Sequence, residues 1–250
     1  MKQYLNFVLL YFLVANCDAV PVNNAEMEKE DPELTAGFFE GDMVLDLTRN
    51  GVKNPLRTWP LAIVRYKIDS VFDADHKLYI EQAMDTIASV TCVRFIPATF
   101  LTFAYVHIYG NPNGCFATVG YLGYKQDLNL QIFDLDTGCF RMGSIIHELL
   151  HIMGFFHQQS ASDRDDYVVI LEENIIEGRE HNFIKYDNDT VTAFGTEYDY
   201  GSIMHYGAKA FSKNGNNTIE TLQPNVLIGQ RVGLSETDID KINSMYNCHV

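Results

Sequence analysis

Apolar and polar residues alternate in several short stretches of the first half of the chain. Because successive side chains of a strand point to opposite faces, this pattern predicts strands, separated by Gly- and Asn-rich turns, at residues 62–68, 93–96, 105–109 and 128–133. A helix is predicted after Asp73, where apolar residues recur at helical spacing: Ile80, Ala83, Met84 and Ile87.

The second half of the chain is richer in helical patterns. Residues 144–153 predict a strong helix that ends at Gly154, and residues 171–186 carry a weaker helical signal. A last helix opens with the capping sequence Ser235-Glu-Thr-Asp238 and runs to about Tyr246. Strands that come first and helices that come later predict the α+β fold class.

Residues 1–19 have the pattern of a secretory signal peptide. Lys2 precedes an apolar run, and small residues follow at Ala15, Cys17 and Ala19. The run is shorter than the ~20 apolar residues that a membrane-spanning helix needs, and no later segment is long enough. We therefore expect a secreted, extracellular protein without a membrane anchor.

Residues 20–49 are strongly acidic and poor in apolar positions. Eight acidic residues face only Lys29 and Arg49, so the segment has little with which to build a core. We predict a pro-segment that an activating trypsin-like protease removes after Arg49, which leaves a domain of residues 50–250. An acidic tail that stays attached is the alternative.

The chain as a whole carries a formal net charge of −15. This charge disfavours any function that depends on neutralising phosphates, so we expect no nucleic-acid partner.

The cysteines are spread singly along the chain, which argues against a cysteine zinc knuckle. Cys17 lies in the signal region, and in an oxidising compartment the remaining four predict two disulfides: Cys92, Cys115, Cys139 and Cys248. Sequons at Asn188 and Asn216 are candidate glycosylation sites.

The predicted helix at residues 144–153 carries a metal-binding pattern. His147 and His151 are four positions apart, so both imidazoles lie on one helix face and can approach the same ion. Gly154 permits a left-handed backbone that turns the chain sharply and brings His157 back as a third ligand. Three neutral nitrogens leave the fourth position of a zinc ion open for water, as in catalytic zinc sites.

Glu148 follows the first of these histidines but lies about 100° further round the helix. Its carboxylate can reach the bound water, take a proton during attack and deliver it to the leaving amine. For the H-E-x-x-H pattern alone, a solvated helix face is a serious alternative. The longer pattern H-E-x-x-H-x-x-G-x-x-H in a secreted chain favours the metal site.

Two further motifs follow the third histidine: Ser202-Ile-Met204-His-Tyr206 and Asp163-Arg-Asp165. Together with the zinc motif they make the chain resemble the astacin family of metzincin zinc endopeptidases over residues 38–248. The resemblance implies a two-lobed α+β metzincin-type catalytic domain, with a twisted N-terminal sheet, two long helices and one zinc ion in the cleft between the lobes. It also implies hydrolysis of internal peptide bonds in polypeptide substrates, and we expect a monomer.

The resemblance also assigns roles to the candidate site residues. It makes Glu148 the general acid/base and the three histidines the zinc ligands: His147, His151 and His157. Met204 would form the tight turn beneath the metal, and Tyr206 would be a weak fifth ligand that moves away to hydrogen-bond the oxyanion. Without the resemblance, packing roles would be expected for Met204 and Tyr206.

In the pro-segment, Phe39-Glu-Gly41-Asp42 looks like the family's aspartate switch. Asp42 would then bind zinc in place of water and keep the zymogen silent, whereas an ordinary turn with an exposed aspartate is the alternative. The resemblance further implies the disulfides Cys92–Cys248 and Cys115–Cys139. The second encloses the strand-like residues 117–121, an edge that pairs with extended substrates in the family.

One residue departs from the family pattern. Family members commonly have Glu where this chain has Gln158, and that Glu contacts the new N-terminus after activation. Glutamine keeps hydrogen-bonding capacity but has no charge to balance an ammonium group. Weaker docking of Asn50 and a different cleavage point therefore both remain open.

Two other function classes compete with an enzyme. One is a zinc-containing but inactive extracellular protein that holds peptides in the cleft, and the other is a structural extracellular domain stapled by two disulfides. The first would lack Glu148 or a zinc ligand, yet all of them are present. The sequence therefore favours the enzyme.

Overall fold

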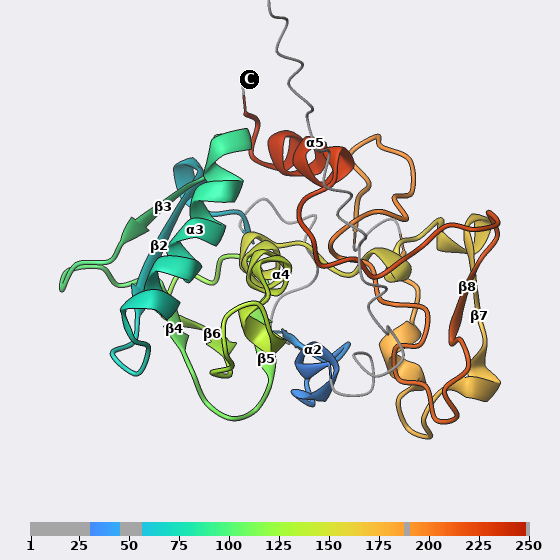
Figure 1. The fold of residues 1–250 in the computed structure, drawn as a ribbon. Coiled ribbons are helices and arrows are strands. Elements are labelled where there is room, and N and C mark those ends of the chain that lie inside the picture. The colour runs from blue at the N-terminus through green and yellow to red at the C-terminus, as the bar shows by residue number, and fades with distance from the viewer. Residues whose placement is uncertain (1–30, 46–56, 188–190, 249–250) are drawn as a thin grey trace, which may run out of the picture.

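The computed structural model describes residues 31–45, 57–187 and 191–248. The signal region, the predicted cleavage point after Arg49 and the sequon residue Asn188 lie outside these residues. Within the described part of the chain, no helix is long and apolar enough to cross a membrane. The predicted α+β class is confirmed, with a six-stranded sheet on one side and a two-stranded sheet among irregular turns on the other (Figure 1).

The larger sheet has the strand order β1-β5-β6-β4-β2-β3. Its strands are β1 (Met43–Val44), β2 (Ile63–Ile68), β3 (Arg94–Pro97), β4 (Val106–Tyr109), β5 (Cys115–Thr118) and β6 (Gln126–Leu130). All pairs are parallel except β5 with β6. The strand predicted at residues 128–133 starts earlier, because the Gln126 N–H already donates to the Tyr105 carbonyl just before β4.

Two long helices cover this sheet. α3 (Ala74–Val90) begins at Asp73, whose side chain caps the His76 N–H, and it buries the four predicted apolar residues. α4 (Met142–Met153) packs against α3, β5 and β6, and nearly all of its residues are buried. The Trp59 indole donates a 2.9 Å hydrogen bond to the Ile152 carbonyl near the end of α4. The helix that carries the metal-binding pattern is thus fixed inside the protein.

A second apolar cluster lies in the other lobe, around Tyr206. It contains residues of β7 (Val168–Ile170) and β8 (Ile219–Thr221) together with aromatic residues from the turns: Phe183, Tyr198, Tyr206 and Phe211. Met204 belongs to the first cluster and Tyr206 to the second, so the turn between them joins the two lobes.

The helix suggested by the weak pattern at residues 171–186 is wrong. The structure has two short 3-10 turns there, Glu172–Asn174 and Glu180–Phe183. Gly178 between them has a φ of 83°, which a helix cannot contain. The apolar residues Ile175 and Phe183 serve the second cluster from these turns instead of from one helix face.

Both disulfides of the resemblance form in the structure. Cys92 pairs with Cys248 after the end of α5 (Glu236–Met245), which ties the last helix to the segment between α3 and β3. Cys115 of β5 pairs with Cys139, just before α4. α5 itself opens with the predicted capping box, in which Ser235 and Asp238 satisfy each other's backbone N–H groups.

The start of α4 packs very closely on the backbone of Arg231. A Cβ added at Gly143 would lie 2.0 Å from the Arg231 carbonyl oxygen. We predict that Gly143→Ala lowers the free energy of unfolding by about 2–3 kcal/mol, although alanine otherwise favours a helix. Urea or thermal unfolding measures this change.

The matched control is Gly233→Ala, since no atom lies within 4 Å of a Cβ at that position. It should change stability by less than about 0.5 kcal/mol. Equal stability of the two variants would contradict the close approach of α4 to Arg231.

Candidate metal centre

The first two candidate ligands and Glu148 are fully buried on α4. His147, Glu148 and His151 are each 0% exposed, so the helix directs these polar side chains into the protein interior. α4 ends at Gly154 with a left-handed φ of 108°, and the Gly154 N–H returns to the His151 carbonyl. This turn redirects the chain and allows His157 to reach the same point.

The three imidazoles meet through their Nε2 atoms. The Nε2 atom of His147 lies 3.1 Å from that of His151 and 3.2 Å from that of His157. Two nitrogens bound to one tetrahedral zinc ion at the usual distance are ~3.3 Å apart. The spacing in the protein therefore fits the ligand set of a single zinc ion.

The other ring nitrogen of each histidine is held by an oxygen. Nδ1 of His147 lies 2.9 Å from the Ile203 carbonyl, and Nδ1 of His151 lies 2.8 Å from the Phe155 carbonyl. A carbonyl only accepts, so each of these Nδ1 atoms carries the proton and Nε2 keeps its lone pair for the metal. Burial, together with the nearby Arg231, also lowers the pKa of His147 to about 4, which favours the neutral ring that a metal requires.

Asp42 completes a four-membered ligand group. Its carboxylate oxygens lie 3.2 Å from Nε2 of His147, 3.4 Å from that of His151 and 3.3 Å from that of His157. The four residues are buried, and their ligand atoms lie within 4.8 Å of one another. A carboxylate oxygen is an ordinary fourth ligand for zinc. The alternative of an exposed aspartate at position 42 is therefore wrong.

Glu148 carries two buried carboxylate oxygens that accept no hydrogen bond from the described residues. Such orphaned acceptors are costly unless a water or an ion serves them, which fits a site built for a metal and its water. Burial, and next the carboxylates of Asp42 and Glu33, raise the pKa of Glu148 well above its usual range.

The turn that contains Met204 is fixed from α5. The Asp238 carboxylate accepts hydrogen bonds from Ser202 Oγ at 2.6 Å and from the Ile203 N–H at 2.9 Å. The carbonyl of the same Ile203 holds His147, so Asp238 supports the ligand through one peptide unit. The sequence identified Asp238 only as a helix cap, because its contacts with the turn are remote in sequence.

Tyr206 is buried beside the ligands, with its ring centroid 4.6 Å from that of His157. Its hydroxyl donates to the backbone carbonyl of Glu40. Burial, and next the Glu40 carboxylate, raise the pKa of Tyr206 well above its ordinary value, so the phenol remains a hydrogen-bond donor.

Sequence reasoning missed Glu40. This buried side chain places one carboxylate oxygen 2.8 Å from Nδ1 of His157 and accepts hydrogen bonds at the other from Tyr186 at 2.7 Å and Ser160 at 3.0 Å. Glu40 thus occupies, for the third histidine, the position that backbone carbonyls occupy for the other two. Glu40 lies inside the Phe39-Glu-Gly41-Asp42 motif, but its partners are more than a hundred residues away in sequence, so the motif alone gave it no role.

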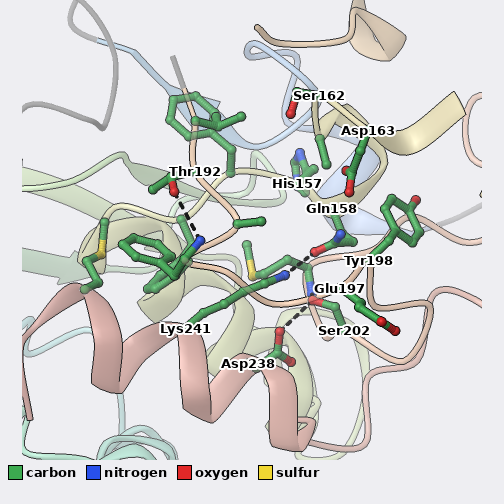
Figure 2. Close-up of a pocket in the computed structure, with 18 of the residues that line it drawn as sticks. His157, Gln158, Ser162, Asp163, Thr192, Glu197, Tyr198, Ser202, Asp238 and Lys241 are labelled. Carbon is green, nitrogen blue, oxygen red and sulfur yellow. Dashed lines mark hydrogen bonds between the residues drawn. The ribbon is translucent and has the colours of Figure 1, made fainter. Parts of the chain in front are cut away.

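Gln158 has a cationic partner inside the protein. The ammonium of Lys241 on α5 donates to Gln158 Oε1 at 2.6 Å, within a pocket that lies next to His157 (Figure 2). Burial lowers the pKa of Lys241, and Asp238 opposes this effect. The glutamine's acceptor oxygen is thus already occupied by a cation of the chain itself.

Of the two sequon residues, only Asn216 is described. It lies exposed on the loop before β8, whereas Thr218 of the same sequon is buried.

The fold and this centre define the class of zinc-dependent metallopeptidases. A helix supplies two histidines and a glutamate, a glycine turn supplies the third histidine, and a methionine-containing turn at the junction of the two lobes supports the first histidine. The chain belongs to the astacin family, since the sequence model of the Astacin peptidase family matches residues 51–247.

Curated relatives agree with this assignment. The chain is 44% identical over 229 residues to zinc metalloproteinase nas-15 of Caenorhabditis elegans, covering 92% of this chain and 39% of that protein. It is 43% identical over 226 residues to seminal metalloprotease 1 of Drosophila melanogaster, covering 88% of this chain and 90% of that protein. The chain thus spans about two fifths of the nematode protein and most of the fly protein.

A solved structure shares the fold at substantial identity. High choriolytic enzyme 1, a hatching enzyme zinc-protease from Oryzias latipes, matches with a TM-score of 0.69 and 39% identity. The match covers 80% of this chain and 94% of that one.

We predict that the precursor retains about one zinc ion per chain after dialysis and that His151→Ala loses it. Removing the His151 imidazole leaves two histidines and the Asp42 carboxylate with a gap where the third nitrogen was, so the ion binds much more weakly and is lost on dialysis. Metal analysis by mass spectrometry measures the content. His181→Ala, at an exposed histidine outside the centre, should retain the ion. Full zinc in the His151 variant would exclude this centre as the binding site.

Proposed function

We propose that this protein is a secreted zinc endopeptidase that hydrolyses internal peptide bonds and is made as a zymogen. The observation that carries the proposal is the convergence of three histidine Nε2 atoms beside a buried glutamate whose carboxylate has no partner among the described residues. That arrangement suits hydrolysis, because the carboxylate is free to serve a water molecule at the metal.

The chain's own residues would divide the proton transfers between them. Glu148 would accept the proton of the attacking water and return it to the leaving amine. A bound zinc ion supplies Lewis acidity, which polarises the carbonyl and lowers the pKa of water. Tyr206 would donate its phenolic hydrogen bond to the oxygen of the attacked carbonyl. Its present bond to the Glu40 carbonyl supports this role, since the acceptor there is also a peptide oxygen.

The outer edge of β5 would bind the substrate backbone. In the precursor this edge is paired in parallel with β1, where the Ala117 N–H donates to the Asp42 carbonyl at 2.9 Å and the Val119 N–H to the Val44 carbonyl at 3.1 Å. An edge that accepts a strand of the pro-segment can accept an extended peptide in its place, with little dependence on side-chain identity.

Residues 31–45 would keep the zymogen inactive through three contacts. Asp42 occupies the fourth ligand position, and β1 covers the edge of β5. The third contact is Glu33, 1% exposed, whose carboxylate lies 2.6 Å from the Arg231 guanidinium and 3.4 Å from that of Arg141. Arg231 holds the pKa of Glu33 well below its usual range despite burial, so the acid is charged and paired.

Both proposed cleavage points, after residue 19 and after Arg49, lie outside the residues that the structure describes. Residues 1–19 would direct secretion and be removed, and a trypsin-like protease would cut after Arg49 to release the pro-segment of residues 20–49 from the catalytic domain of residues 50–250. The acidic contacts described above support this division. They attach residues 31–45 to the metal centre and to Arg231, and none of these residues belongs to the buried set of either apolar cluster.

Glu148→Gln tests the mechanism. We expect the activated variant to fold and keep its zinc, while its rate of casein hydrolysis falls by about three orders of magnitude or more through loss of the proton acceptor. Glu173→Gln, at an exposed acid, is the matched control and should retain activity. Near-normal turnover by the Glu148 variant would refute the assigned role.

Asp42→Ala and Glu33→Ala test the inhibition separately. Loss of Glu33 leaves Arg231 buried without its closest acid, which costs about 3 kcal/mol and should raise the fraction of undocked pro-segment on the order of a hundredfold. Peptide hydrolysis by the uncut precursor, checked for intactness by mass spectrometry, should rise for both variants. Thr35→Ala, exposed on α2 (Pro32–Thr35), should stay inactive. A silent precursor in both acid variants would show that neither contact holds the segment.

A further inference from the structure

The loop between β3 and β4 exposes three large apolar side chains close together. Phe100 is 96% exposed, Leu101 79% and Phe103 77%. Within the described residues, no other stretch of four positions exposes three large hydrophobic side chains to this extent. In Figure 1 this loop projects from the β3 end of the sheet, beyond the body of the protein.

We propose that this loop is a membrane-inserting tip that holds the protein at a neutral lipid surface. Exposed apolar clusters of this kind indicate an interaction surface, because single exposed hydrophobic residues are common but groups of them are unusual in free proteins. A projecting tip has no cavity to enclose a small ligand, but its apolar side chains can enter the acyl region of a bilayer.

Part of the tip's backbone is hydrogen-bonded within the turn itself. The Thr102 N–H donates to the Thr99 carbonyl at 3.1 Å, and the Thr99 N–H donates to Thr102 Oγ1 at 2.9 Å. The Leu101 N–H is directed at Thr99 Oγ1 at 3.4 Å. Polar backbone groups that are bonded within the turn lose less on leaving water.

These bonds also favour lipid over a protein partner. A protein interface surrounds its apolar centre with polar groups that bond across to the partner. Here the two threonine hydroxyls nearest the tip are engaged with each other, at 3.2 Å, and with the turn's own backbone. The tip therefore offers apolar surface without free side-chain hydrogen-bonding groups.

Charge narrows the choice of lipid. No Asp, Glu, Lys or Arg occurs between Arg94 and Lys125, so no charge of the loop itself would have to be desolvated. The whole chain carries −15, and an anionic surface would repel it. The fitting surface is therefore a zwitterionic bilayer such as phosphatidylcholine.

The position of the loop leaves the metal centre accessible. β3 and β5 lie towards opposite ends of the strand order, with β6, β4 and β2 between them. The tip can enter a bilayer while the edge of β5 faces away from it, so lipid binding and peptide hydrolysis are separable.

The test uses phosphatidylcholine vesicles and the zinc-loaded chain from residue 20 onward, because the apolar run within residues 1–19 would itself bind vesicles. In flotation, wild-type protein should rise with the vesicles, and the variant Phe100→Ser/Leu101→Ser/Phe103→Ser should partition at least about tenfold more weakly, since each buried side chain contributes on that order. Leu227→Ser, at a lone side chain that is 85% exposed, is the control and should partition as wild type. Vesicles with added phosphatidylserine should bind no more protein than phosphatidylcholine alone.

A fluorescent variant gives an independent measurement. The chain's single tryptophan, Trp59, is 2% exposed, so Phe100→Trp adds the one solvent-accessible indole. Its emission should shift to shorter wavelength with vesicles and be quenched by brominated lipid. Absence of both flotation and shift would overturn the proposal. So would self-association without lipid that the triple variant abolishes, because a second copy would then cover the tip.

Discussion

The structure depends on holding three imidazole lone pairs towards one point in a buried space. The Nε2 atom of His147 lies 3.1 Å from that of His151 and 3.2 Å from that of His157, a spacing that is favourable only when a cation lies between the nitrogens. Each ring is kept in place through Nδ1, and one of these partners, the Ile203 carbonyl, comes from the turn that joins the two lobes. Assembly of the metal centre and packing of the two lobes are therefore coupled.

Three acidic residues of the N-terminal segment make specific contacts inside the protein. Glu33, Glu40 and Asp42 are almost completely buried, and each has a specific partner: Arg231, His157 and the ligand group, respectively. Buried carboxylates are tolerated only when they are paired, so the charges of this segment match the buried groups that it contacts. Net charge alone indicated only that nucleic acid is an unsuitable partner.

The sequence predicts those features that depend on residues close together in the chain. α3 and α5 begin at predicted caps, and α4 ends at the predicted glycine, because caps and helix stops involve neighbours within four residues. The pairs Arg231–Glu33 and Lys241–Gln158 join residues 198 and 83 positions apart, and no periodicity reports such contacts. The expected helix at residues 171–186 failed for the same reason, since its apolar residues pack into a cluster built from distant turns.

The larger sheet would keep the two proposed functions on separate surfaces. Its β5 edge pairs with a backbone strand through N–H and C=O groups, whereas the β3–β4 loop bonds part of its backbone within its own turn and presents apolar side chains. Three strands lie between β5 and β3, the strand that leads into the loop, a separation of roughly 19 Å at the usual strand spacing. A sheet of that width keeps the β5 edge away from a surface that the loop enters, so bound lipid would leave both the approach of substrates to that edge and the chemistry at the metal unchanged.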